Sequence, residues 1–126
     1  METARCLILD PRGALVRKCA GEERVFTTAR CLERAAEGDA RMVVILFGNS
    51  SNARRGGLVD FVSILKRNAQ TADVAVVAVL PARHRLLIEA LQMVRTDYVL
   101  IIPENTIDSF CIGASLDKLT PHDQPE

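Results

Sequence analysis

The residues best suited to chemistry lie in one polar stretch, Gly48 to Gly57, which reads GNSSNARRGG. Two arginines precede two glycines there, at the expected start of a helix. Guanidinium groups and free backbone N–H groups at such a position can converge on an anion. The alternative is that the arginines are solvated loop charges and the glycines only permit a turn. The candidate anion-binding residues are Arg12, Arg54, Arg55, Gly56 and Gly57.

The other reactive side chains form no catalytic pattern. Ser50 and Ser51 lack the second glycine of a G-x-S-x-G nucleophile elbow, so we expect turn residues. His84 and His122 are isolated from further metal ligands, so we expect no metal. No GxGxxG or Walker motif follows the first expected strand, which argues against a dinucleotide or a nucleoside triphosphate. We therefore predict a protein without a cofactor and without enzymatic activity.

Length and charge narrow the function further. The chain has 126 residues, which fits one domain. Its 16 basic and 16 acidic side chains cancel, so no global field attracts nucleic acid or an anionic membrane. Apolar residues make up 48% of the chain and Trp is absent, which predicts a core of Val, Leu, Ile and Ala. Such a core is typical of a parallel sheet packed under helices.

The four cysteines predict a reducing compartment. They form no C-x-x-C pair, and each lies in an apolar segment, so we expect buried thiols that act as small hydrophobes. The start METARC lacks the pattern of a signal peptide, and no apolar run approaches the length of a membrane span. We predict a cytoplasmic protein that does not enter a membrane.

Short apolar runs alternate with segments of helical period, which indicates an α/β fold. We expect a first helix that Thr28 caps and that stops at Gly38. A second helix follows Gly56 and Gly57 and carries an apolar stripe of Leu58, Phe61, Val62 and Leu65. A third spans His84 to Val94, with an apolar stripe of Leu87, Ala90, Leu91 and Val94, and a last one starts near Asn105 or Thr106. The five expected strands are Arg5 to Leu9, Arg24 to Thr27, Met42 to Phe47, Val74 to Leu80 and Tyr98 to Ile102.

The connection between the first two strands has two interpretations. A short helix can span residues 11–21, with Asp10 as N-cap, Pro11 in the first turn and Gly21 as C-cap. Alternatively, the chain turns at residues 11–13 and ALVRK forms an antiparallel strand. We favour the helix, because its length of about 15 Å matches a five-residue strand.

The order of segments resembles a response-regulator receiver domain of the two-component, chemotaxis-regulator type, over roughly Arg5 to Leu119. The family's run of second strand, helix, third strand, loop, glycine-leucine pair and third helix is similar to RVFTTARCLERAAEGDARMVVILFGNSSNARRGGLVDFVSILKR. Its fourth strand resembles ADVAVVAVLPA, and its fifth resembles TDYVLIIP. The resemblance implies a flavodoxin-like three-layer sandwich. It has a five-stranded parallel sheet in the order 2-1-3-4-5, helices on both faces and a shortened first helix. Residues 1–119 would form the domain, and residues 120–126 a polar tail or the start of a linker.

The resemblance also implies where a receiver's phosphorylation site would lie. Receivers phosphorylate an aspartate that ends the third strand, bind Mg²⁺ with two acids after the first, and use a hydroxyl and a lysine that end the fourth and fifth. The matching positions hold one acid and no hydroxyl, lysine or acceptor aspartate. We therefore expect a degenerate phosphoacceptor pocket formed by Asp10, Gly48, Asn49, Leu80, Ile102 and Pro103.

These observations favour a phosphorylation-independent receiver-like module that binds a protein partner or a second copy of itself. We expect this domain to make no direct contact with nucleic acid. One alternative is a module that binds a small anion or a nucleotide; a flavodoxin-like enzyme fits less well, because 4% aromatic residues offer little to stack on a flavin. By the resemblance, the possible interface comprises Arg83, Arg85, Glu89, Gln92, Arg95 and Asp97.

Overall fold

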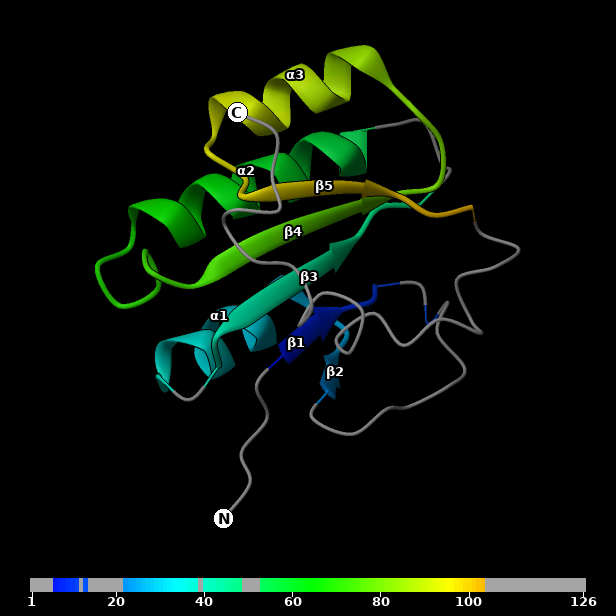
Figure 1. The fold of residues 1–126 in the computed structure, drawn as a ribbon. Helices are drawn as coiled ribbons and strands as arrows, with labels where there is room; N and C mark the ends of the chain where they lie inside the picture. The colour runs from blue at the N-terminus through cyan, green and yellow to red at the C-terminus, as the bar shows by residue number, and fades with distance from the viewer. Residues whose placement is uncertain (1–5, 12, 14–21, 39, 49–52, 104–126) are drawn as a thin grey trace.

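The computed structural model describes residues 6–11, 13, 22–38, 40–48 and 53–103, and for residues 53–56 the backbone alone. Five strands in this part of the chain form one parallel sheet in the order β2-β1-β3-β4-β5, which confirms the predicted flavodoxin-like topology (Figure 1). The strands are β1 (Cys6–Leu9), β2 (Glu22–Val25), β3 (Met42–Leu46), β4 (Ala75–Leu80) and β5 (Tyr98–Ile101).

Four of the five strands lie within one residue of their predicted bounds, but β2 begins two residues earlier than predicted. Glu22 pairs with Cys6 and Val25 pairs with Leu9, so the strand ends at Val25. Phe26 then leaves the sheet and is 53% exposed. Val25 and Phe26 are adjacent apolar residues, so the sequence does not show which of the two side chains is buried. The pairing register with β1 determines that Val25 is.

Three helices connect the described strands: α1 (Thr28–Ala36), α2 (Ala53–Arg67) and α3 (Arg85–Met93). Thr27, not Thr28, caps α1, since its hydroxyl accepts the Arg30 N–H at 3.1 Å. Gly38 follows the end of α1 with φ of +90°, as its predicted role as a helix stop requires. The cap of α3 is the imidazole of His84, which accepts the Leu87 N–H at 3.2 Å.

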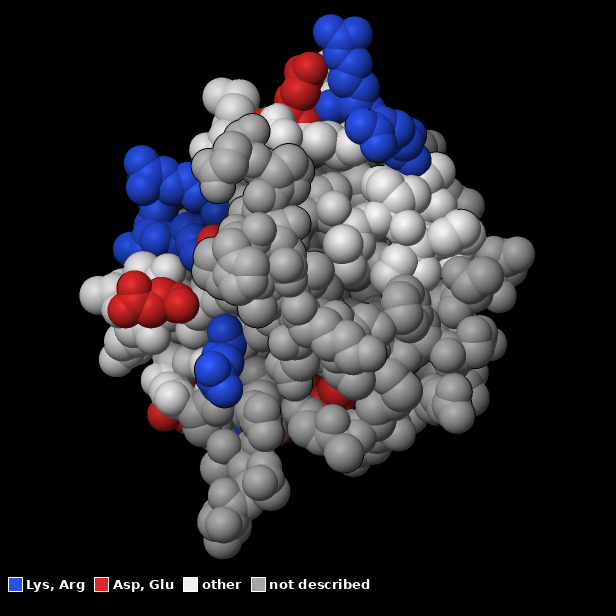
Figure 2. Space-filling view, viewed as in Figure 1, with Lys and Arg blue, Asp and Glu red and all other residues white. Residues whose placement is uncertain are grey.

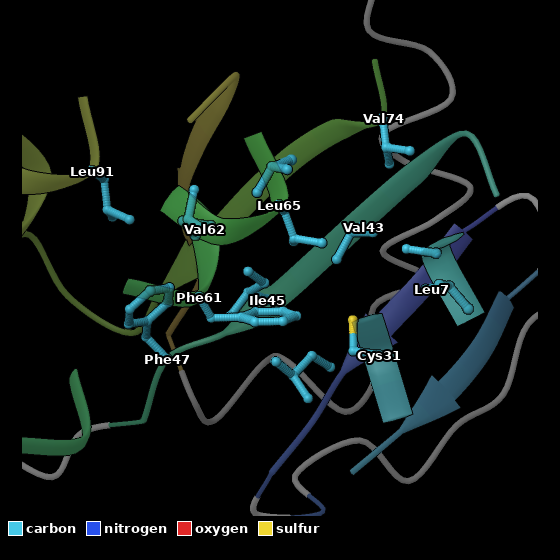
Figure 3. Packing of buried hydrophobic residues seen from close by; sticks show 14 of the residues in the cluster. Leu7, Cys31, Val43, Ile45, Phe47, Phe61, Val62, Leu65, Val74 and Leu91 are labelled. Carbon is cyan, nitrogen blue, oxygen red and sulfur yellow. The ribbon is translucent and has the colours of Figure 1, made fainter. Parts of the chain in front are cut away.

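All three helices cover the same face of the sheet, and the buried side chains between them form the larger core cluster (Figure 3). α2 contributes Phe61, Val62 and Leu65, and Leu65 and Val62 are fully buried. α3 contributes Leu87 and Leu91. This confirms the predicted apolar faces of both helices, because the i, i+3, i+4 spacing brings these side chains to one side.

The opposite face of the sheet carries a second, smaller apolar cluster: Cys6, Ile8, Val44, Leu46, Val77, Val79 and Ile102. All of these side chains are at most 7% exposed. The helix predicted from Asn105 or Thr106 lies outside the described residues, as does the predicted tail at residues 120–126.

The chain turns sharply after β1. The Gly13 N–H donates to the Asp10 carbonyl at 3.1 Å, and Gly13 has φ of +66°. A right-handed helix does not tolerate that φ, so the predicted helix is wrong at its first turn. Pro11 and Gly13 suit a tight turn, with Pro fixing φ and Gly accepting the left-handed conformation. Residues 14–21, where the helix and the hairpin interpretations differ, lie outside the described part of the chain.

Candidate functional site

The predicted pocket residues that the structure describes follow the carboxyl ends of four adjacent strands. Asp10 follows β1, Gly48 lies two residues past β3, Leu80 ends β4, and Ile102 and Pro103 follow β5. Hydrogen bonds extend the sheet one residue past its strands: Phe47 N–H donates to the Val79 carbonyl and Ile102 N–H to the Leu80 carbonyl, both at 2.9 Å. The sheet therefore brings these positions to one edge, where ligands of open α/β sheets bind. Asn49 lies outside the described residues.

Asp10 is buried at 1% exposure, and its carboxylate lies 3.8 Å from the Arg24 guanidinium of β2. Its backbone N–H also donates to the Val25 carbonyl at 2.9 Å. Arg24 in turn lies over the Phe26 ring, 5.7 Å from the centroid. Asp10 is thus integrated into the junction between β1 and β2.

The other described positions of this edge are apolar. Leu80 is fully buried and packs in the larger cluster, whereas Ile102 is 7% exposed and packs in the smaller one. Gly48 is half-buried and Pro103 is exposed. Among the described residues, no group of three or more His, Cys, Asp or Glu side chains could hold a metal ion.

The candidate anion-binding residues do not form the loop that the sequence predicts. α2 begins at Ala53, so Arg54, Arg55, Gly56 and Gly57 all lie in its first turns and not ahead of it. Ala and Arg are strong helix formers, and this preference offsets the cost of two glycines. A Cβ at Gly57 would meet nothing within 4 Å, so Gly57 is not required by a close contact. Arg12 and the side chains of residues 53–56 lie outside the part of the chain that the structure describes.

The six predicted interface residues are all exposed and lie on α3 or near it. Arg85 and Glu89 form an ion pair at 3.2 Å along the helix. Asp97 has a structural role: its carboxylate accepts the Val76 N–H at 2.7 Å and the Lys66 ammonium at 2.9 Å. Arg95 has φ of +67° and ends the turn between α3 and β5.

Two exposed apolar residues of α3, Leu86 and Met93, were not predicted from the sequence as functional candidates. Leu86 is 70% exposed and Met93 is 84% exposed, the two largest exposures among the large apolar side chains described. The sequence did contain a signal, because both residues fall outside the buried stripe of α3. A single exposed apolar side chain is ordinary, whereas several on the same side of a helix can mark a binding surface.

The cysteines in the described part of the chain are not candidates for chemistry. Cys6 and Cys31 are both buried. Burial raises the pKa of the Cys31 thiol to about 12, so the nucleophilic thiolate is scarce at neutral pH. Cys19 and Cys111 lie outside the described residues.

No family model matches this sequence, and no curated protein matches it. Solved structures do. The phosphorylated cyanobacterial phytochrome response regulator RcpA matches with a TM-score of 0.56 and 8% identity, covering 88% of this chain and 90% of that one. The Mn²⁺-bound response regulator Rcp1 matches with a TM-score of 0.57 and 9% identity, covering 91% and 96%. The chain therefore has the receiver fold, and identities this low carry the comparison no further.

None of the described helices has the length and apolarity needed to span a membrane.

Proposed function

We propose that this chain is a receiver-fold signalling module that works without phosphorylation, by binding protein. One observation carries the proposal. Of the described positions that follow β1, β3, β4 and β5, only Asp10 offers a carboxylate, and that carboxylate faces Arg24 at 3.8 Å. Mg²⁺ needs an octahedral set of oxygen ligands and is bound by carboxylates together with phosphate oxygens. A single carboxylate beside a guanidinium provides few oxygen ligands and a neighbouring positive charge, which disfavours Mg²⁺ binding.

Ile102 supports the same proposal. Its position corresponds, through the resemblance, to the lysine that neutralises the phosphoryl group in receivers. Here the side chain packs in an apolar cluster with Ile8, Leu46 and Val79. An ammonium group there would be desolvated without a partner, whereas isoleucine gains from burial. The residue is suited to a core and not to charge neutralisation.

The surface that we assign to partner binding is the exposed side of α3 together with β5. It carries the charged residues predicted from the resemblance, and it exposes Leu86, Met93 and Ile101, the last at 39%. An apolar centre with a polar rim is typical of a protein interface. In Figure 2, positive and negative side chains stand out above α3, and the described surface toward the carboxyl end of β5 is mostly uncharged.

The experiment is treatment with acetyl phosphate and Mg²⁺ followed by intact mass spectrometry. We expect no gain of a phosphoryl group, while a conventional receiver treated in parallel gains one. The variant Asn49→Asp provides a matched comparison, since it restores a carboxylate at one of the two positions, Gly48 and Asn49, that the resemblance offers for the acceptor. A hydroxylamine-sensitive phosphoryl adduct on the natural sequence would show that the proposal is wrong.

A further inference from the structure

The N-terminal cap of α3 is a side chain that can take up a proton. The Nδ1 atom of His84 accepts the Leu87 N–H at 3.2 Å, and the His84 carbonyl accepts the Ile88 N–H at 2.9 Å. Histidine changes its charge between about pH 5 and pH 8. A protonated imidazole carries an N–H on both ring nitrogens and has no lone pair left to accept a hydrogen bond. The cap bond to Leu87 therefore forms only with the neutral ring.

The cap of α1 provides a comparison within the same molecule. The Thr27 hydroxyl accepts the Arg30 N–H at 3.1 Å at the start of α1. Arg30 and Leu87 each lie three residues after the capping residue, so the two bonds have equivalent places in their helices. A hydroxyl keeps its lone pairs throughout the pH range in which histidine titrates. The cap of α1 is thus constant, whereas the cap of α3 is sensitive to protons.

A positive charge on His84 weakens the start of α3 further. Arg83 and Arg85 lie on either side of it in the chain, and the positive end of the α3 dipole lies at the same place. Arg85 pairs with Glu89 at 3.2 Å. The described charged residues of α2, which packs against α3, are Asp60, Lys66 and Arg67. None of these pairs with His84, and β4 and β5 carry no charged side chain. Among the described residues, no carboxylate pairs with the ring to stabilise its protonated form.

The other end of α3 leaves the helix little stability in reserve. The turn after α3 places Arg95 at φ of +67°, a conformation that glycine adopts more easily. Among the described side chains, the Thr96 hydroxyl is the buried polar group without a hydrogen-bond partner. A helix of nine residues depends on its caps and its packing. Loss of the N-cap bond should therefore loosen the first turn of α3.

We propose that protonation of His84 opens the first turn of α3, so that this helix is a pH-sensitive switch. The turn is closed while the ring is neutral and opens as the pH falls through the titration of the ring. Leu87 is 8% exposed, so water replaces the lost acceptor poorly. Leu86 in the same turn is 70% exposed on the surface assigned to partner binding. The opening is independent of what binds there, whereas its effect on a partner rests on the proposed function.

Solvent exchange of backbone amides, followed in ¹H–¹⁵N spectra from about pH 8 to about pH 5, tests the switch. Rates are corrected for the intrinsic pH dependence of exchange. We expect the protection of the Leu87 amide to fall about fivefold, as for the loss of a typical N-cap bond. The fall should coincide with the titration of the His84 ring resonances, while the protection of the Arg30 amide stays constant. A Leu87 amide that does not follow the ring overturns the proposal.

Variants of the two histidines separate the cap from other effects of pH. Asparagine is a good N-cap whose oxygen does not titrate, so His84→Asn should keep Leu87 protected throughout. His84→Ala provides no acceptor and should leave Leu87 poorly protected at every pH. His122→Gln removes the chain's other histidine and should leave the natural response unchanged. A response that persists in His84→Asn, or that disappears in His122→Gln, contradicts the proposal. Phosphoryl transfer to the natural chain would remove the proposed function but not the switch.

Discussion

The two ends of the sheet differ in how they use charge. At the amino end, Arg34 of α1 donates to both carboxylate oxygens of Glu23 at 2.8 and 2.7 Å and also to Glu37. Lys66 and Asp97 form a further ion pair there, at 2.9 Å. At the carboxyl end, the described residue that directly follows each strand is apolar, except Asp10, which lies 3.8 Å from Arg24. The amino ends of β3, β4 and β5 lie on the left in Figure 1.

This difference is in line with the proposed function, because a receiver that accepts a phosphoryl group needs charged side chains at the carboxyl edge. Ligands of open α/β sheets bind at the carboxyl edge. Here the well-formed charge networks tie helices to strands: Arg34 ties α1 to β2, and Lys66 ties α2 to the turn before β5. The contrast indicates that the polar residues in the described part of the chain serve stability more than chemistry.

The largest expected effect comes from removing Arg34. Its side chain is 9% exposed, and Glu23, its partner, is 33% exposed. Arg34→Ala leaves that carboxylate without its bidentate partner, so we expect the free energy of unfolding to fall by about 3 kcal/mol, the lower end for breaking a buried pair. Urea unfolding measures it. Arg30→Ala on the same helix is the control, because the Arg30–Glu33 pair is exposed and worth about 0.5 kcal/mol or less.

A charge at the carboxyl edge should be the next most costly change. Ile102→Lys places an ammonium group next to an apolar cluster, and we expect a loss of about 2 kcal/mol, because the lysine stem can partly carry the charge toward water. Ile102→Val is the control and should cost about 1 kcal/mol. If Ile102→Lys is as stable as the natural chain, the carboxyl edge is a polar site and the contrast between the two ends is wrong.

Asp97 offers a smaller test at the amino end. Asp97→Ala leaves the Val76 N–H and the Lys66 ammonium without this acceptor, and we expect a loss of about 1.5 kcal/mol in the free energy of unfolding. Asp97→Asn retains an oxygen for the Val76 N–H, so it should restore about half of that loss. Glu89→Ala is the matched control, since its exposed pair with Arg85 should contribute about 0.4 kcal/mol. Equal effects of Asp97→Ala and Glu89→Ala would contradict a structural role for Asp97.

Sequence reasoning predicted the fold better than the networks that hold it together. The apolar runs and helical stripes are local patterns, so strands such as β4 and helices such as α3 were predicted to within one residue. The start of α2 was wrong because Gly56 and Gly57 suggested a boundary that the surrounding helix formers override. The bounds of β2 depend on pairing with β1, which the sequence of β2 does not contain.

The ion pairs could not have been predicted in the same way. Arg34 and Glu23 are eleven residues apart, and Lys66 and Asp97 are 31 residues apart, so only the folded topology brings them together. The resemblance predicted which positions line the carboxyl edge, because that follows from strand order. It assigned Asp97 to an interface, and the structure gives Asp97 two hydrogen bonds within the domain.

The most direct test of the central claim is a comparison of ¹H–¹⁵N spectra of the labelled protein with and without beryllofluoride and Mg²⁺, which together mimic a phosphorylated aspartate. We predict unchanged amide resonances for Gly48, Ile102 and the α3–β5 face, because the described carboxyl edge offers Asp10 as its one acid. A saturable shift at Gly48 that spreads to α3 would show that the chain binds a phosphoryl group after all.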